Sequence, residues 1–241
     1  MKEVYNNILE AIFNNKKLLA ILIDPDKFSV NNTASFIKKV NLSFTTHIFV
    51  GGSTVEEHVT EIVVSKIKKH TNLPIVLFPG DVSQITNEAD ALLFLSLISG
   101  RNPEYLIGKH VEAVSKLKKL NLEVIPTGYI LIENGKETAV EEVTKTIPLP
   151  RNNIQHIIDT AKAGEFLGMK LMYLEAGSGA KESLNHEIIS SVKKELKIPL
   201  IVGGGIRSKS ELEDAYKSGA DMVVVGTILE DDESFFDNLQ T

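Results

Sequence analysis

Short apolar runs alternate with longer amphipathic segments along most of the chain. The apolar runs are rich in β-branched or aromatic residues and predict strands at Leu18–Ile23, His47–Val50, Ile75–Phe78, Ala91–Leu95, Leu122–Pro126, Lys170–Leu174, Pro199–Val202 and Met222–Val225. Helical periodicity is clear between most of them, in segments that include Phe36 to Val40, Val55 to Val63, Leu106 to Leu117, Ile154 to Ala161 and Leu212 to Tyr216. Strands that are apolar on both faces are typical of a parallel sheet covered by helices. The pattern therefore predicts an α/β fold, a (β/α)8 barrel of the TIM type.

The regular alternation fails after the third predicted strand. The segment from Pro79 to Glu88 is too short, and too rich in Gly, Asp and Asn, to form a full helix. We therefore expect a modified barrel with an irregular or missing helix after strand 3. A length of 241 residues suits a barrel that forms one domain, so we expect residues 1–241 to be a single catalytic domain.

Composition narrows the classes of function. The formal net charge of −6 disfavours nucleic-acid binding, which requires a basic surface. The chain contains no cysteine, which excludes disulfides and thiolate nucleophiles and fits a cytoplasmic protein. The N-terminal residues lack the layout of a signal peptide, and the most apolar run, Ala91 to Ile98, is too short to cross a bilayer. The six histidines form no metal-spaced pair, and we assign them no role.

Three consecutive strand ends carry glycine-dense loops. Gly177-Ser178-Gly179 follows the sixth predicted strand, Gly203-Gly204-Gly205 the seventh and Gly226-Thr227 the eighth. Glycine lets backbone N–H groups approach an anion closely, and the late loops of such barrels commonly hold phosphate. These loops predict a phosphate site, although glycines can also serve only to permit tight turns. Arg207 either pairs with the phosphate or faces solvent.

A carboxylate, Glu175, lies within the first of these loops. Because side chains alternate along a strand, Glu175 shares a side with Tyr173 and is expected to point toward the barrel mouth. Burial and a nearby phosphate would both raise the pKa of Glu175 toward the range useful for a general base. The alternative is a rim carboxylate paired with a neighbouring lysine.

Asp24 and Ser53 follow the first and second predicted strands. Adjacent strands lie about 4.8 Å apart, so one oxygen from each residue could reach the same cation. Mg²⁺ accepts such a sparse set when substrate phosphates supply further oxygens. Both residues could equally cap helices, and Asp26, two residues further into the loop, is less well placed as a ligand.

Taken together, these motifs resemble those of one family. The chain resembles the geranylgeranylglyceryl phosphate synthase family, which includes bacterial heptaprenylglyceryl phosphate synthases, in the motifs Tyr173-Leu174-Glu175-Ala176-Gly177-Ser178-Gly179, Gly203-Gly204-Gly205-Ile206-Arg207, Gly226-Thr227, Asp24-Pro25 and Gly51-Gly52-Ser53. Further similar motifs are Arg101-Asn102-Pro103-Glu104 and Thr127-Gly128-Tyr129-Ile130, so the resemblance spans nearly the whole chain.

The resemblance implies a Mg²⁺-dependent prenyltransferase. It would join geranylgeranyl diphosphate to the C3 hydroxyl of sn-glycerol 1-phosphate, giving the ether-lipid precursor geranylgeranylglyceryl phosphate. Glu175 would be the catalytic base, and Asp24 and Ser53 would hold the metal. Substrate binding would fall to Tyr173, Leu174, Glu175, Ala176, Gly177, Ser178, Gly179, Gly204, Gly205, Gly226 and Thr227. Some relatives carry a lysine where this chain has Leu22, so that phosphate contact must come from elsewhere.

A prenyl tail also requires an apolar groove that is open at the side. Its walls could come from Ala91–Leu95 with Ile98 and from Tyr129–Ile132, which could also be ordinary barrel packing. Such a groove suggests peripheral membrane contact for product release, and the family implies a homo-oligomer. The resemblance also leaves a heptaprenylglyceryl phosphate synthase open as the alternative.

Other phosphate-binding barrels fit the residues less well. Isomerases of the histidine pathway would place carboxylates after the first and fifth strands, whereas Thr127-Gly128-Tyr129 follows the fifth. A Schiff-base aldolase needs an inward lysine, and Lys170 is poorly placed at the start of its strand. A noncatalytic phosphate-binding barrel is the alternative from another class.

Overall fold

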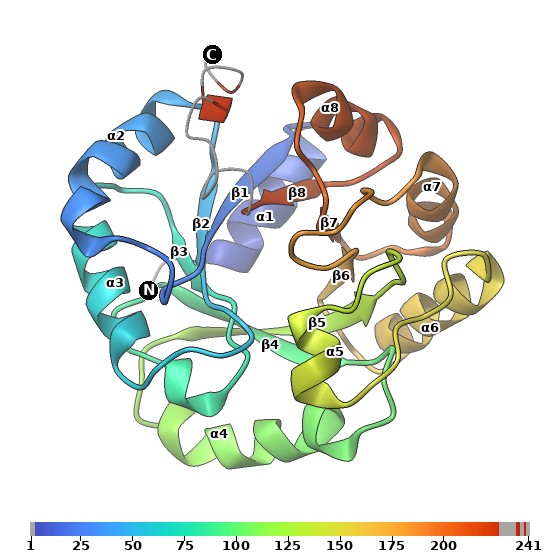
Figure 1. The fold of residues 1–241 in the computed structure, drawn as a ribbon, viewed down its shortest axis with the longest axis horizontal. Coiled ribbons are helices and arrows are strands. Elements are labelled where there is room, and N and C mark those ends of the chain that lie inside the picture. Colours follow the sequence, from blue (N-terminus) through green and yellow to red (C-terminus); the bar gives the residue numbers. More distant parts are fainter. Residues whose placement is uncertain (1–2, 227–234, 237–238, 240–241) are drawn as a thin grey trace.

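The strands form one closed barrel. A computed structural model describes residues 3–226, 235, 236 and 239. The strands are β1 (Leu18–Ile23), β2 (His47–Val50), β3 (Ile75–Leu77), β4 (Ala91–Leu97), β5 (Glu123–Leu131), β6 (Leu171–Glu175), β7 (Leu200–Gly203) and β8 (Met222–Val225). All neighbours pair in parallel and in chain order, and β8 closes the barrel against β1 (Figure 1). This confirms the predicted fold class.

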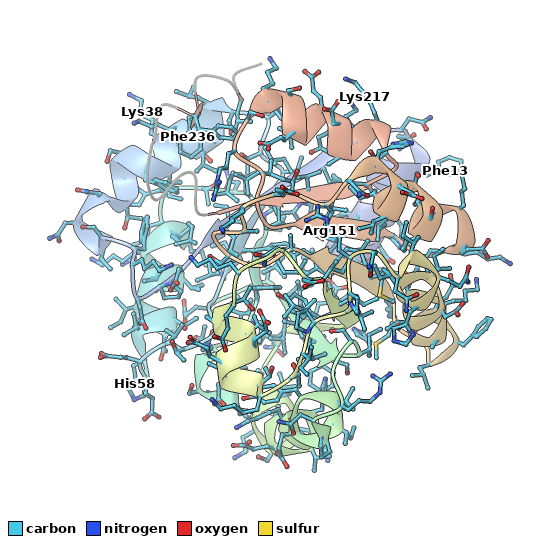
Figure 2. The ribbon with its side chains drawn as sticks, turned by 45° about the vertical axis from the view of Figure 1, so that its right-hand side comes forward. Phe13, Lys38, His58, Arg151, Lys217 and Phe236 are labelled. Carbon is cyan, nitrogen blue, oxygen red and sulfur yellow. The ribbon has the colours of Figure 1, made fainter. Side chains whose placement is uncertain are left out.

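Helices surround the barrel in a ring (Figure 1). The ring contains α2 (Thr33–Leu42), α3 (Val59–Lys68), α4 (Lys109–Leu117), α6 (Ile154–Phe166), α7 (His186–Glu195) and α8 (Lys209–Lys217). Helix α1 (Val4–Phe13) packs at the amino-terminal end of the barrel, and α5 (Ala139–Thr144) lies at the opposite end. Charged side chains such as Lys38 on α2 and Lys217 on α8 lie on the outside of this ring (Figure 2). Within the described ranges, the chain has no helix with the length and apolarity needed to cross a membrane.

Strand alternation sorts the apolar side chains into two layers. Along β1, Leu18 and Ala20 pack inside the barrel, whereas Leu19, Ile21 and Ile23 pack between the strand and the helices. Continuing this alternation points the residue after β1, Asp24, toward the barrel mouth. The same rule places Tyr173 in the inner layer and Leu174 in the outer one.

The barrel wall is notched between β3 and β4. These strands pair only at Val76 with Ala91 and at Leu77 with Leu92, although β4 continues to Leu97. The connection between them contains the short 3-10 turn η2 (Val82–Gln84) and no α-helix. The irregularity predicted after strand 3 is therefore confirmed, and it leaves the upper half of β4 without a neighbour on that side.

The fifth strand is longer than its sequence predicts. Thr127, Gly128 and Tyr129 were expected to follow the strand but lie within β5, which pairs with β4 up to Tyr129 and with β6 up to Leu131. Gly128 weakens a strand, but the hydrogen bonds that β5 forms with both β4 and β6 hold this segment in the sheet. Glycine also fits because a Cβ there would lie 2.8 Å from the terminal methyl carbon of Met172.

The helix before β5 presents a different face from the one its periodicity predicts. Val111 and Val114 are 67% and 39% exposed, whereas His110 and Ala113 are buried. The cause is the π-helical turn η3 (Glu104–Gly108), which directly precedes α4. A π turn contains an extra residue, so it rotates the helical face that follows.

The amino-terminal end of the barrel is covered by α1. Val4 and Ile8 pack into the inner layer, and the Glu123 carboxylate accepts hydrogen bonds from the backbone N–H groups of Val4 at 2.5 Å and Tyr5 at 3.2 Å. These bonds satisfy N–H groups that the first turn of a helix leaves unpaired. With this end covered, access to the barrel is from the carboxyl ends of the strands.

Candidate active site

A polar cavity opens at the carboxyl ends of the strands. Its lining includes many of the predicted site residues, namely Asp24, Ser53, Tyr173, Glu175, Ser178, Gly179, Gly204, Gly205 and Gly226. The residues come from the ends of β1, β2, β6, β7 and β8, as expected for an active site in a barrel of this kind. Leu22 lines the same cavity at the position where some relatives carry a lysine.

Glu175 is the last residue of β6 and is only 6% exposed. Burial raises the pKa of its carboxyl from the ordinary value of 4.5 to about 7. The N–H of Gly177 donates to Oε1 of Glu175 at 2.7 Å, and this hydrogen bond lowers the pKa of the carboxyl. In the described part of the chain, no lysine or arginine pairs with Glu175, so the rim salt bridge considered above is not formed. A pKa near 7 lies in the range that suits a general base at neutral pH.

Two tyrosines lie beneath this carboxylate. The rings of Tyr129 and Tyr173 stack with their centroids 5.3 Å apart, and Phe78 packs edge-on against both. Burial and the nearby Glu175 raise the pKa of both tyrosines, so their hydroxyls stay protonated. Phe78, Tyr129 and Tyr173 all line the cavity, so part of its wall is aromatic.

The glycines of the β6 and β7 loops permit close backbone packing. Gly177 and Gly204 have positive φ angles of 101° and 84°, which disfavour other residues. A Cβ on Gly204 would lie 2.7 Å from the nitrogen of Gly177 and 2.8 Å from that of Ala176, and would overlap Oε1 of Glu175. The two loops therefore meet backbone to backbone beside the carboxylate.

Some of the predicted substrate residues do not line the cavity. Leu174 and Ala176 pack in the outer layer, and the Ala176 N–H donates to the Gly203 carbonyl at 3.1 Å. Gly177 contributes its N–H to Glu175. Thr227 lies outside the described residues. The substrate-binding roles of these four residues, like those of the residues that do line the cavity, stay predictions.

Asp24 and Ser53 both line the cavity, but they do not form a complete metal site by themselves. The Oδ2 atom of Asp24 lies 3.4 Å from Lys27 Nζ, and its Oδ1 accepts from the Asp26 N–H at 3.2 Å. Asp26 accepts from the Glu56 N–H at 3.3 Å and so links the loops after β1 and β2. Within the described ranges, no group of three or more His, Cys, Asp or Glu side chains could hold a metal ion. The oxygen donors fit Mg²⁺ only if a substrate completes the set.

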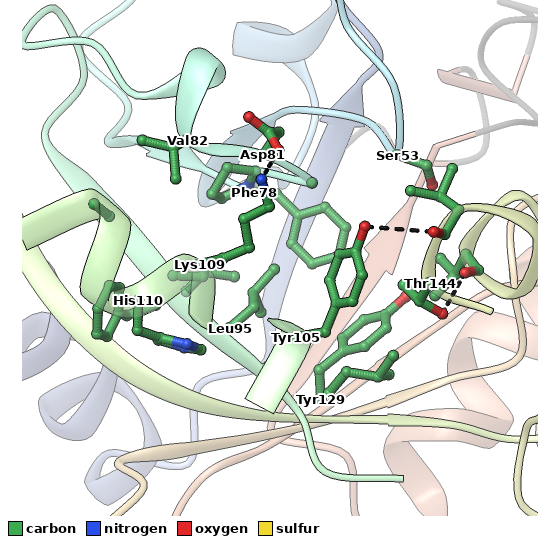
Figure 3. A pocket seen from close by; sticks show the side chains of 18 of the residues that line it. Ser53, Phe78, Asp81, Val82, Leu95, Tyr105, Lys109, His110, Tyr129 and Thr144 are labelled. Carbon is green, nitrogen blue, oxygen red and sulfur yellow. Dashed lines mark hydrogen bonds and ion pairs between the residues drawn. The ribbon is translucent and has the colours of Figure 1, made fainter. Parts of the chain in front are cut away.

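A second, apolar cavity, shown in Figure 3, shares part of its lining with the first. Its lining includes inner-layer residues such as Leu93 and Leu97 and outer-layer residues such as Leu92 and Ala113. It therefore passes from the barrel mouth, through the notch between β3 and β4, into the layer beneath α4. The space corresponds to the position that a helix after β3 would occupy in a regular barrel.

The sequence identified only part of this cavity. Leu92 to Leu95 and Tyr129 line it as expected, whereas Ala91, Ile98 and Ile130 to Ile132 do not. The lining residues that were missed include Phe78, Tyr105, His110, Val140 and Val143. Tyr105 donates to the Val143 carbonyl at 3.4 Å and thereby joins η3 to α5 across the opening (Figure 3). An ion pair between Asp81 and Lys109, 2.8 Å long, lies at the other side. No local sequence signal marks these contacts, because they join segments far apart in the chain.

Comparisons with known proteins give a consistent result. The profile of the PcrB family matches residues 11–241. The geranylgeranylglyceryl phosphate synthase of Flavobacterium johnsoniae is 55% identical over 235 residues, covering 98% of this chain and 97% of the relative. The protein of the same name from Zunongwangia profunda is 53% identical over 233 residues, covering 97% and 99%.

A solved structure agrees over the whole fold. The crystal structure of (S)-3-O-geranylgeranylglyceryl phosphate synthase from Thermoplasma acidophilum, in complex with its substrate sn-glycerol-1-phosphate, superposes with a TM-score of 0.92 at 33% identity. The match covers 99% of this chain and 96% of that chain.

Proposed function

The chain belongs to the PcrB family, and we propose that it is a prenyltransferase that joins geranylgeranyl diphosphate to the C3 hydroxyl of sn-glycerol 1-phosphate. The product is geranylgeranylglyceryl phosphate, an ether-lipid precursor. The relatives that carry this name match almost the full length of the chain.

One structural observation carries the proposal. The polar and apolar cavities share part of their lining, in Gly52, Ser53, Phe78, Tyr129 and Val140. A polar acceptor in one cavity and the tail of a donor in the other would therefore bring their reacting ends together at this shared wall. A barrel that bound phosphate without catalysis would need neither the apolar cavity nor a buried base beside the glycine loops.

The chemistry follows from this placement. With its phosphate against the glycine loops, the acceptor directs its C3 hydroxyl inward to Glu175. The hydroxyl oxygen forms a bond to C1 of the prenyl diphosphate while Glu175 takes the hydroxyl proton. The bond between C1 and the diphosphate oxygen breaks, and the diphosphate leaves with the electron pair. Because the pKa of Glu175 is about 7, its base form is available near neutral pH.

Asp24 and Ser53 are the residues that would hold Mg²⁺ in this proposal. Their carboxylate and hydroxyl oxygens are of the type that Mg²⁺ prefers, and the open cavity leaves space for diphosphate oxygens. When bound, Mg²⁺ would neutralise charge that develops on the departing diphosphate.

The apolar cavity would take the prenyl tail. Burial contributes about 0.8 kcal/mol per CH₂ group, so each isoprene unit that fits inside the cavity strengthens binding considerably. Donors of different length are then distinguished by how much of the tail reaches the space between η2 and α4, where Ile85, Leu92 and Ala113 lie.

The test is to incubate the protein with labelled sn-glycerol 1-phosphate, Mg²⁺ and farnesyl, geranylgeranyl or heptaprenyl diphosphate. We expect a prenyl ether, with the highest kcat/KM for geranylgeranyl diphosphate. A higher kcat/KM for the heptaprenyl donor would establish the alternative within the family. No ether from any donor would refute the proposed function.

A further inference from the structure

The polar cavity needs positive charge that its strand ends do not supply. Asp24 and Glu175 both line it, and the end of β1 carries Leu22 rather than a cation. On the proposed function, which this inference deepens, the acceptor adds a phosphate monoester dianion to the same space. Lys27 lines the cavity but is paired with Asp24. Besides the backbone N–H groups of the glycine loops, other cations near these loops are a further source of counter-charge for the phosphate.

Arg207 is one such cation. It follows the β7 glycine loop and lines the cavity. Its backbone N–H donates to Oε2 of Glu211 at 2.8 Å, which fixes the main chain at the start of α8. Its guanidinium then extends toward the β6 loop, where Nη2 donates to the Gly179 carbonyl at 3.4 Å. The charge of Arg207 thus lies against the predicted phosphate loop.

Lys136 reaches the same glycine from another direction. A Cβ on Gly179 would lie 4.0 Å from Lys136 Nζ, so the ammonium group lies close to this loop. Lys136 belongs to the connection between β5 and α5, far from β6 in sequence. Two independent segments therefore bring a cation to Gly179.

A buried asparagine explains why Lys136 is held in this position. Asn134 is 8% exposed, and its Nδ2 donates to the Ala176 carbonyl, at the base of the β6 loop. Its Oδ1 accepts from the Lys136 N–H at 3.1 Å. The Asn134 side chain thus fastens the backbone of Lys136 to the loop that contains Gly177 and Gly179.

The two cations share a further property. Among the described residues, neither Lys136 nor Arg207 forms an ion pair, whereas Lys27, Lys109 and Arg151 do. Both side chains are exposed and lie close to Gly179, which lines the cavity, while Glu175 in the same cavity is buried. This arrangement orients a ligand that is anionic at one end and carries a hydroxyl at the other.

We propose that Lys136 and Arg207 form a two-cation clamp for the phosphate group of the acceptor. The clamp would supply the charge that Leu22 does not, and it selects phosphate monoesters over uncharged polyols. It also sets the direction of the acceptor, with the phosphate outward and the reacting hydroxyl inward.

The test uses calorimetric binding of sn-glycerol 1-phosphate, and of inorganic phosphate, to the wild-type protein and three variants. Lys136→Met and Arg207→Met remove one charge each while keeping much of the side-chain volume. Lys38→Met, on the outer face of α2 (Figure 2), removes a charge far from the cavity and is the matched control. We expect each clamp variant to raise the Kd of both ligands about tenfold, as for loss of one charge-assisted hydrogen bond. The control should keep the wild-type Kd.

A kinetic measurement separates the clamp from a general structural defect. In the clamp variants, KM for sn-glycerol 1-phosphate should rise while KM for the prenyl diphosphate stays at the wild-type value. Wild-type binding with unchanged Kd values in both clamp variants would overturn the inference and leave the proposed function standing. Failure of the wild-type protein itself to bind sn-glycerol 1-phosphate would overturn both.

Discussion

Replacing Glu175 with glutamine should remove most of the activity and yet stabilise the folded protein above neutral pH. Burial raises the pKa of Glu175 from 4.5 to about 7, so the folded state holds this proton more tightly than the unfolded chain does. At about 1.36 kcal/mol per pH unit, the ionised carboxylate destabilises the fold by about 3 kcal/mol. The loss of stability begins as the pH rises above 4.5 and is complete somewhat above pH 7. Glutamine stays neutral and can still accept the hydrogen bond from Gly177.

Thermal unfolding between pH 4.5 and 8.5 measures this effect. Because about 1 kcal/mol shifts Tm by about 2–4 °C in a chain of this size, Glu175→Gln should gain about 6–12 °C near pH 8 and little at pH 4.5. The exposed residue Glu187 on α7 provides the control, and Glu187→Gln should follow the wild type at every pH. Turnover of Glu175→Gln should fall about 10²–10⁴-fold, as for loss of a general base.

Two results would contradict this reasoning separately. A Tm difference between Glu175→Gln and wild type that does not change with pH would mean that the carboxyl does not titrate near neutrality in the folded state. Near-normal turnover would mean that another group removes the proton of the acceptor hydroxyl.

Three other predictions concern the metal, the glycine loops and a buried histidine. Asp24→Asn should raise the Mg²⁺ concentration for half-maximal activity about tenfold or more. An unchanged Mg²⁺ titration would leave Asp24 with a structural role only, in its contacts with Asp26 and Lys27. Gly204→Ala should lower the free energy of unfolding in denaturant by about 1–3 kcal/mol and raise KM for sn-glycerol 1-phosphate. The new Cβ would overlap Glu175, and the φ of 84° at this position disfavours alanine. Wild-type values of both quantities would argue against the close packing of the two loops. Burial lowers the pKa of His47 from 6.5 to about 4, so the folded state disfavours its charged form. In the Glu175→Gln background, which removes the opposite contribution of Glu175, stability should therefore fall by about 2–3 kcal/mol as the pH drops from about 7 to 4.5, which urea unfolding can measure. His47→Asn should lose much of this pH dependence, and an equal dependence in the variant would assign it to other groups.

Much of the site could be predicted because strand alternation is set by backbone geometry. The order of residues in β1 and β6 places Asp24, Tyr173 and Glu175 on the inner side, and this holds even where a predicted strand end is wrong by a residue. The glycine-dense ends were similarly informative, since Gly179, Gly204, Gly205 and Gly226 all line the polar cavity. Parallel strands then bring these ends together whatever the details of the loops.

The features of the site that the sequence did not predict depend largely on contacts between segments that are far apart in the chain. Asn134 and Lys136 gave no signal in the sequence, since their positions follow from hydrogen bonds to the loop after β6. The face of α4 could not be predicted from a period of 3.6 residues, because the π turn before it rotates the helix. Likewise, α5 is a six-residue helix, too short for periodicity, although its Thr138 and Glu141 form a capping box.

The absence of an α-helix after β3 affects how the hydrophobic core beside β4 is filled. In a regular barrel, a helix would cover the outer face of β4 beside the notch. On the proposed function, the prenyl tail occupies that space against Leu92 and Ala113, so the lipid serves as a removable part of the hydrophobic core. Each catalytic cycle then assembles and dismantles a portion of the folded structure, and donor binding and folding stability become linked quantities.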